Sequence, residues 1–321
     1  MRIALLLVCC FILPGTAFCW GFYAHQRINY LAVFLLPPEM MVLYKPNIQF
    51  LTDHSVDPDK RRYAYSSEGP RHYIDIDLYG SYPYNELPKK YDSAIQKFSE
   101  DTVLEKGIVP WWIQTMQSRL TTAFKERNAA KIIRLSAEIG HYIADSHVPL
   151  HTNSNHDGQL TNQRGIHGFW ESRLPELFAE KEFDFILGKA SYIADIEKYT
   201  WNRIMESAAA ADSVLQGEST ISKQFPPDRK FAFEQRNGKL VRQYSSEYSG
   251  AFNKQLKGMV ERRMCASIVS VASFWYTAWI NAGQPDLKNL ESAAFSNEDL
   301  REFELLNEAW KSGTLKGRSD E

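Results

Sequence analysis

Histidine and carboxylate side chains are concentrated between residues 141 and 171, a segment that holds five of the chain's eight histidines. His141 and Asp145 stand four residues apart in a stretch with helical spacing of apolar residues, and His167 and Glu171 repeat that separation. Residues four apart leave one face of an α-helix, so each pair can present a nitrogen and an oxygen to the same ion. A single such pair is more often an ordinary hydrogen-bonded pair, but core packing does not require two of them. The clustering therefore predicts a metal centre.

His151 is a further predicted ligand from this segment. Pro149 lacks a backbone donor and disfavours helix before it, so the preceding helix should end there. His151 then lies on the following turn, where it can point back at the same spot. His147 lies roughly 200° around the helix from Asp145, and we interpret it as a packing residue.

The composition is that of a globular protein with balanced charge. The 321 residues are 44% hydrophobic, which is ample for a core, and the formal net charge is -2. A generally basic nucleic-acid binder is thereby excluded, although a local basic groove is compatible with this total.

Residues 1–19 have the pattern of a cleaved signal peptide, with an early arginine, an apolar run and small residues before the boundary. The run is too short for a membrane-spanning helix, and no later segment reaches the ~20 apolar residues required. We therefore expect a secreted or periplasmic protein without a transmembrane segment, whose mature chain begins at Trp20. A lipoprotein acylated at Cys19 is the alternative. Cleavage would leave only Cys265, so we expect no internal disulfide.

Apolar residues recur at helical intervals along most of the mature chain, and strand signals are scarce. The predicted helices cover residues 20–36, 38–44, 92–106, 110–128, 132–146, 191–215 and 248–282. An exposed excursion with a hairpin near Asn237 is predicted for residues 216–243, and a charged surface tail for residues 286–321. The sequence thus predicts an all-α fold with one mostly helical domain over residues 20–285.

A long loop from residue 45 to 87 is predicted to carry short helices and polar residues, and a loop of this length in a compact domain needs a functional reason. The loop contains Asp57, Asp59, His72, Asp75 and Asp77, which are candidates for completing the site. Asp53, which directly precedes His54, competes with Asp57, but the Asp-Pro-Asp pattern favours Asp57.

Histidine and carboxylate ligands without cysteine are typical of catalytic zinc, whereas cysteine-rich shells are typical of structural zinc. Iron or manganese is the alternative metal. Di-iron bundles place Glu and His three residues apart, and the spacing of four in this chain counts against them.

From Trp20 to about Gly283 the chain resembles the superfamily of zinc-dependent phospholipases C and single-strand-specific zinc nucleases. The segments that carry the resemblance are WGFYAH at the mature amino terminus, HSVDPD, RHYID, HYIADSHVPLH and HGFWE. The resemblance implies an all-α fold and a site for up to three zinc ions that hydrolyses phosphodiesters.

The resemblance also implies a ligand set, with Asp145 as a bridge. One zinc would be held by Asp57, His72, His141 and Asp145, a second by His151, His167 and Glu171, and a third by Trp20, His25 and Asp145. Trp20 would contribute its free amino group and carbonyl oxygen. Asp57 is in addition the candidate base that orients or deprotonates the attacking water.

The two branches of this superfamily differ in substrate, and the chain has features of both. The WGxxxH opening and the VPLH turn resemble the nucleases, whereas Glu171 and the HSVDPD loop resemble the phospholipases C. We expect a phosphodiester hydrolase of the phospholipase C type that acts on phospholipid headgroups or related phosphoesters. A nuclease that cleaves single-stranded DNA or RNA to nucleotides is the alternative, and a non-catalytic, metal-stabilised binding protein is the third hypothesis.

Overall fold

The computed structural model describes residues 21–236, 238–288, 290 and 294–316. The predicted signal peptide and Trp20 lie outside the described residues. The described chain is mostly helical and forms a single domain, which confirms the predicted all-α class.

The secondary-structure elements are named in chain order. The first part of the chain contains α1 (Phe22–Val33), α2 (Pro38–Tyr44), α3 (Ile48–Asp53), η1 (His54–Val56), α4 (Asp57–Ala64), η2 (Gly69–Arg71), η3 (Ile76–Tyr79), α5 (Tyr91–Phe98), α6 (Glu100–Glu105), α7 (Val109–Lys125), α8 (Ala129–Asp145) and η4 (Pro149–Thr152). The second part contains α9 (Ile166–Gly168), η5 (Phe169–Arg173), α10 (Leu174–Glu182), α11 (Ile196–Gln224), η6 (Pro227–Arg229), β1 (Phe231–Arg236), β2 (Lys239–Tyr244), α12 (Ser246–Gln255), α13 (Met259–Asn281) and α14 (Asn297–Ser312). The η elements are 3-10 helices, except that η5 is a π-helix.

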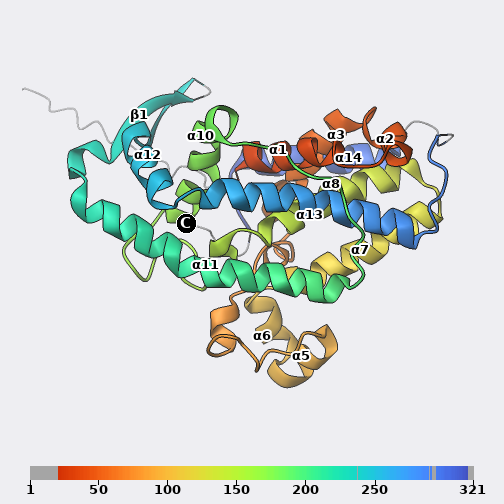
Figure 1. The fold of residues 1–321 in the computed structure, drawn as a ribbon, viewed down its shortest axis with the longest axis horizontal. Helices are drawn as coiled ribbons and strands as arrows, with labels where there is room; N and C mark the ends of the chain where they lie inside the picture. Colours follow the sequence, from red (N-terminus) through yellow and green to blue (C-terminus); the bar gives the residue numbers. More distant parts are fainter. Residues whose placement is uncertain (1–20, 237, 289, 291–293, 317–321) are drawn as a thin grey trace, which may run out of the picture.

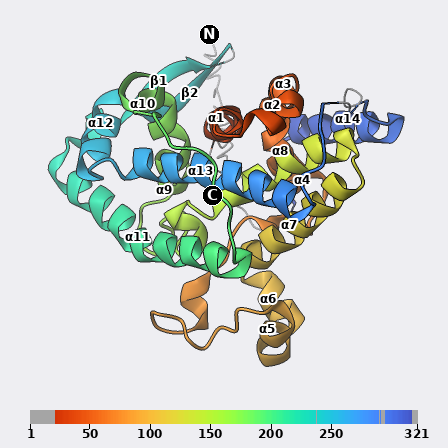
Figure 2. The same cartoon turned by 45° about the vertical axis from the view of Figure 1, so that its right-hand side comes forward.

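Helix α13 runs through the middle of the molecule and contacts α1, α7 and α8 (Figure 1). The same arrangement is visible after a turn of 45° about the vertical axis (Figure 2). Trp275 of α13 is fully buried, and its indole nitrogen donates to the Ser136 carbonyl of α8 at 3.0 Å. The apolar carboxyl-terminal half of α13 is therefore part of the core, against which α8 is fixed.

Helix α8 is buried at every residue from 136 to 145. Gly140 lets α1 approach closely, because a Cβ at this position would lie 2.1 Å from Asn29 Oδ1. Asn29 in turn donates to the Ala137 carbonyl at 3.0 Å. This contact holds α1 against α8 and brings His25, one turn earlier on α1, beside the end of α8 that carries the predicted ligands.

Two of the predicted helices are interrupted. The predicted helix over residues 248–282 is divided into α12 and α13 at Lys257 and Gly258, which have φ of 50° and 75°. The predicted helix over residues 92–106 is divided into α5 and α6 at Ser99, with φ of 70°. Left-handed backbone of this kind ends an α-helix even where the apolar period continues beyond it.

The predicted surface tail contains a docked helix. Helix α14 begins with a capping box in which Ser296 and Asp299 satisfy each other's backbone groups. It packs on α4, and Arg134 of α8 donates to Asp299 at 2.5 Å and to Glu302 at 2.6 Å. The charged residues of this region therefore attach α14 to the domain. Residues 317–321 lie outside the described residues.

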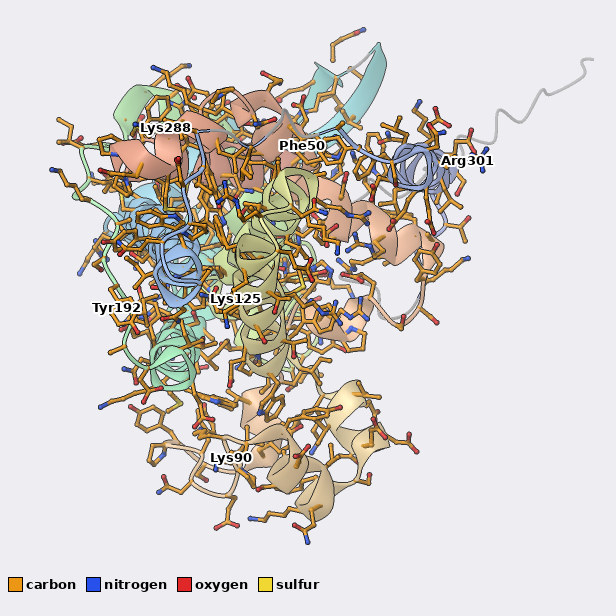
Figure 3. All side chains as sticks on the ribbon, turned by 90° about the vertical axis from the view of Figure 1, so that its right-hand side faces the viewer. Phe50, Lys90, Lys125, Tyr192, Lys288 and Arg301 are labelled. Carbon is orange, nitrogen blue, oxygen red and sulfur yellow. The ribbon has the colours of Figure 1, made fainter. Side chains whose placement is uncertain are left out.

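Two parts project from the helical body. Strands β1 and β2 form an antiparallel hairpin at the predicted place, while residues 216–224 are the end of α11. Helices α5 and α6 form a lobe at the opposite end of the molecule from Phe50 and Arg301, and Lys90 lies within this lobe (Figure 3). Among the described residues, every helix is too short or too polar to cross a membrane.

Candidate metal centre

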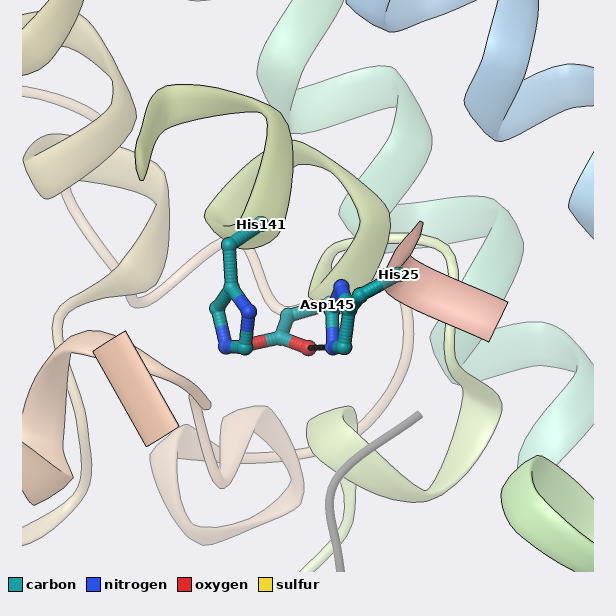
Figure 4. A group of neighbouring side chains, drawn as sticks. All are labelled: His25, His141 and Asp145. Carbon is teal, nitrogen blue, oxygen red and sulfur yellow. Dashed lines mark ion pairs between the residues drawn. The ribbon is translucent and has the colours of Figure 1, made fainter. Parts of the chain in front are cut away.

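His141 and Asp145 leave the same face of α8, as their spacing predicts, and both are fully buried (Figure 4). His141 Nε2 lies 3.3 Å from Asp145 Oδ2. The other oxygen, Oδ1, lies 3.4 Å from His25 Nε2 and 3.8 Å from His151 Nδ1. One carboxylate therefore faces imidazole nitrogens on two sides, which is the geometry that a bridging ligand requires.

A first group of potential ligands consists of Asp59, His72 and His141, all buried. Asp59 Oδ1 lies 3.5 Å from His141 Nε2 and 3.8 Å from His72 Nδ1. His72 Nδ1 also lies 3.0 Å from Asp145 Oδ2 and 3.1 Å from His141 Nε2. These nitrogen and oxygen atoms converge from α4, α8 and the segment after η2, and they could hold one ion.

Asp59, and not the predicted ligand Asp57, lies in this group of potential ligands. Asp57 is the first residue of α4, and its carboxylate contacts His54 Nδ1 at 2.6 Å and Lys60 Nζ at 3.0 Å. Asp59 lies two residues later, roughly 200° around the helix, and therefore faces the opposite side. The two carboxylates also differ in pKa: burial raises the pKa of Asp59, whereas His54 and Lys60 lower that of Asp57 against the effect of its burial.

A second group consists of His151, His167 and Glu171. His151 lies in η4, on the turn that follows α8 and two residues after Pro149, as predicted. His167 Nε2 lies 3.1 Å from Glu171 Oε2, and His151 Nε2 lies 3.4 Å from the same oxygen. Glu171 belongs to the π-helical turn η5, which follows α9 directly.

The hydrogen bonds on the outer side of three histidines determine which nitrogens face inward as acceptors. Nδ1 of His141, His151 and His167 lies 2.9, 2.7 and 3.2 Å from the carbonyl oxygens of Ser55, His72 and His156, respectively. A carbonyl can only accept, so in the neutral rings each Nδ1 carries the proton and each Nε2 presents a lone pair. Nε2 of His151 and Nε2 of His167 are nevertheless only 3.1 Å apart. Two lone pairs at this distance repel each other unless a cation lies between them.

His25 joins the centre from α1. Its ring stacks on that of His141 with centroids 3.7 Å apart, and it forms a third group with His141 and Asp145. Gly21 begins the described chain with its backbone N–H donating to the Glu171 carbonyl at 3.3 Å. The start of α1 therefore lies against the turn that carries Glu171. Trp20 lies outside the described residues, and its role as a ligand stays a prediction.

The donor atoms at this centre fit a bound cation. Both ring nitrogens of His25 and both carboxylate oxygens of Asp59 are buried without a hydrogen-bond partner among the described residues. Leaving such groups buried and unpaired costs several kcal/mol as an order of magnitude, and metal coordination removes that cost. His25 is ready for coordination, since burial and the neighbouring His141 lower its pKa to about 3.

His72 behaves differently from His25. Burial alone would lower the pKa of His72, but the carboxylates of Asp145 and Glu68 raise it to about 9 in the metal-free protein. A proton on His72 would then partly neutralise these acids. A metal ion that binds there must displace this proton.

Sequence reasoning missed two residues that support the centre. Glu68 is fully buried and stands four residues before His72, the same spacing that identified the other pairs. Asp157 is buried, and its carboxylate accepts from the backbone N–H groups of Gly165 at 2.8 Å and His167 at 3.3 Å. Glu68 could have been found by its spacing, whereas Asp157 fixes the loop before α9 through contacts that no local pattern indicates.

A cavity of about 680 Å³ lies beside the centre. Its walls include Tyr73, which follows His72, and His156, whose carbonyl accepts from His167. Asp75, Glu105 and Lys106 are its charged lining residues. The cavity therefore adjoins neighbours of the ligand groups, while the ligand residues themselves do not line it.

No protein-family model and no curated protein sequence matches the chain. Among solved structures, the chain is similar to the alpha toxin from Clostridium absonum, with a TM-score of 0.42 and 12% sequence identity. The match covers 89% of this chain and 68% of the toxin chain.

Proposed function

We propose that the protein is a zinc-dependent phosphodiester hydrolase of the phospholipase C type. The observation that carries the proposal is the set of three buried ligand groups, two of which share His141, while Asp145 Oδ1 lies 3.8 Å from His151 Nδ1 of the third group. A structural zinc ion has a closed shell of four protein ligands. Adjoining groups that share a ligand are instead typical of a multinuclear hydrolytic centre. The histidine and carboxylate donors, without cysteine, favour zinc.

Zinc ions at such a centre supply Lewis acidity and a water molecule activated for attack on phosphorus. The residues of the chain provide the remaining functions. Asp145 and His141 would hold the metal, because both side chains leave one face of the buried helix α8. Asp59 replaces Asp57 as the candidate base, since its carboxylate lies within the centre.

Positive charge next to the centre suits a phosphodiester substrate. Arg62 follows Asp59 by one turn of α4, is buried, and is close enough to act electrostatically on both Asp59 and His72. A guanidinium in this position can bind the phosphate oxygens and stabilise the charge that develops on them during hydrolysis. The surrounding protein excludes bulk water and strengthens this interaction.

Two observations bear on the substrate class. Glu171 as the last ligand supports the phospholipase C type, whereas the placement of His25 five residues after Trp20 supports the nuclease alternative.

We further propose that the protein acts outside the cytoplasm, as a secreted or periplasmic enzyme whose mature amino terminus is Trp20. The position of Gly21 beside Glu171 supports this, because a free amino group on Trp20 would then be close to the centre.

The experiment compares two substrates under matched conditions. Mature protein is incubated with phosphatidylcholine vesicles and with denatured DNA, each with and without a chelator, and bound zinc is counted by elemental analysis. We expect at least two zinc ions per chain and chelator-sensitive release of the phosphorylated headgroup. Cleavage of DNA alone would replace the first proposal by the nuclease. Full zinc loading without hydrolysis of either substrate would favour the binding protein.

A further inference from the structure

We propose that Glu68 is a positioning residue that fixes the ring of His72 and strengthens it as a metal ligand. Glu68 Oε1 lies 3.6 Å from His72 Nε2, the ring nitrogen that points away from the centre. His72 Nδ1 faces inward, towards Asp145 and His141. The inference rests on the metal centre of the proposed function but not on its substrate.

His72 differs from the other histidines whose outer nitrogen has a partner. In His141, His151 and His167 this partner is a neutral backbone carbonyl. In His72 the nearest acceptor is the Glu68 carboxylate, which lies at an ion-pair distance of 3.6 Å and not within hydrogen-bond distance. A carboxylate on the outer nitrogen favours the tautomer with the lone pair directed at the metal, and it increases the basicity of the ligating nitrogen.

Glu68 is itself held from three directions, so it can orient another side chain. Tyr142 of α8, one residue after His141, donates its hydroxyl to Glu68 Oε1 in a short hydrogen bond. Arg71 binds the other oxygen, Oε2, at 2.5 Å, and Arg61 lies 3.7 Å from Oε1. Glu68 is fully buried, which excludes water as a competing partner for His72.

The arrangement also joins two ligands that lie far apart in the sequence. His141 is a ligand on α8, and the next residue, Tyr142, anchors the carboxylate that orients His72. The ring of Tyr142 additionally contacts that of His72 edge-on, with centroids 5.4 Å apart. Helix α8 therefore sets the direction of His72 as well as supplying its own two ligands.

The test measures metal affinity, which does not depend on the substrate. Glu68→Gln keeps the size of the side chain and removes its charge. Competition with a chromophoric zinc chelator should show one zinc ion bound roughly 10- to 100-fold more weakly, the usual effect of losing such a partner. Replacement of zinc by cobalt should show a changed visible absorption spectrum for that ion. In a turnover assay, kcat should fall while KM stays nearly constant.

Glu138→Gln is the matched control. Glu138 is also buried and accepts from Arg61 at 2.8 Å, but it does not belong to any of the ligand groups among the described residues. We expect Glu138→Gln to lower the melting temperature without weakening zinc binding. Equal zinc affinity in Glu68→Gln and Glu138→Gln would overturn the proposal.

Tyr142→Phe provides a second variant that leaves every charge in place. Loss of its hydrogen bond should weaken the same zinc ion by a smaller factor, and this result decides the question if Glu68→Gln does not fold. Unchanged affinity and an unchanged cobalt spectrum in Tyr142→Phe would then overturn the proposal. If the wild-type protein binds zinc but hydrolyses no phosphodiester, the proposed function fails while the role of Glu68 is still measured.

Discussion

Two charged regions border α8, one partly exposed and one buried, and their charges are balanced in different ways. The first is the ionic network of Arg61, Arg134, Glu138, Asp299 and Glu302. Every acid in it lies within ion-pair distance of an arginine, from 2.5 Å for Arg134–Asp299 to 3.9 Å for Arg61–Glu302. The second is the metal centre, where the buried acids mainly face imidazoles.

The difference separates a structural role from a functional one. The ionic network contains its own cations, so it needs nothing from outside the chain. In the metal centre the carboxylate oxygens of Asp59 have no hydrogen-bond partner among the described residues, and lone pairs of His151 and His167 face each other. Buried groups of this kind favour a cation as their partner, so the centre could hold metal ions.

Removal of the metal is the most direct test of this difference between the two regions. If zinc completes the centre, its removal with a chelator should abolish hydrolysis and lower stability by roughly 4 kcal/mol for each ion present at 1,000 times its Kd. The measurement is thermal unfolding with and without added zinc, and with magnesium as the control ion. A melting temperature that does not respond to zinc would show that protonated side chains, and not zinc, balance the charge of the buried carboxylates.

The two aspartates of α4 allow a matched pair of substitutions. Asp59→Asn should reduce activity by more than about 100-fold and release zinc, because loss of a ligand exceeds the effect of losing a ligand's partner. Asp57→Asn should retain zinc, since Asp57 contacts His54 and Lys60 instead. Zinc content and kcat/KM of both variants check this expectation. The reverse outcome would restore Asp57 as the ligand.

Zinc affinity should rise with pH. The raised pKa of His72, about 9 in the metal-free protein, means that zinc must displace a proton at any lower pH. Affinity for the ion at His72 should therefore increase roughly tenfold per pH unit between the ordinary histidine pKa and pH 9. The stability of the metal-free protein should instead fall as pH rises. The stabilisation by protonated His72 is complete below pH 6.5 and is lost as pH approaches 9. Zinc titrations and thermal unfolding at several pH values measure both trends, and zinc affinity that is independent of pH would contradict the expectation.

Breaking the ionic network should affect α14 and leave the centre intact. Arg134→Met removes the contacts to Asp299 and Glu302, which are partly exposed, so the expected loss is about 1 kcal/mol. Zinc content and hydrolysis should not change. Arg301→Met, at an exposed position on α14, is the control for loss of charge alone. Loss of zinc in Arg134→Met would show that the two regions are not separate.

Local spacing identified most of the centre, because four-residue spacings on a helix determine directions without help from the fold. His141 with Asp145, and His167 with Glu171, are brought together as predicted. The choice between Asp57 and Asp59 could not be made in this way. Both stand at the start of one short helix, and only the positions of His54 and His141 decide which face of α4 is the inner one.

The class of the fold followed from apolar periodicity, but helix ends and docking did not. The interruptions at Ser99 and Gly258 depend on left-handed backbone that the apolar pattern does not encode. Helix α14 has a readable capping box at Ser296, yet its place against α4 depends on Arg134, which is distant in sequence. The charged composition of residues 286–321 therefore predicted an exposed tail, whereas these charges attach α14 to the domain.

The π-helical turn η5 makes the number of residues in this segment as important as their identity. Arg173, at the end of the turn, binds Glu234 of the hairpin and donates to the Tyr244 carbonyl at 3.1 Å, while Glu171 faces the centre. A π-helical turn holds one residue more than an α-helical turn, so deleting one residue would return η5 to α-helical winding and change which of its side chains face the centre and which face the hairpin. Substitutions in η5 would alter single contacts, but a change in its length would alter the contacts of Glu171 and Arg173 together.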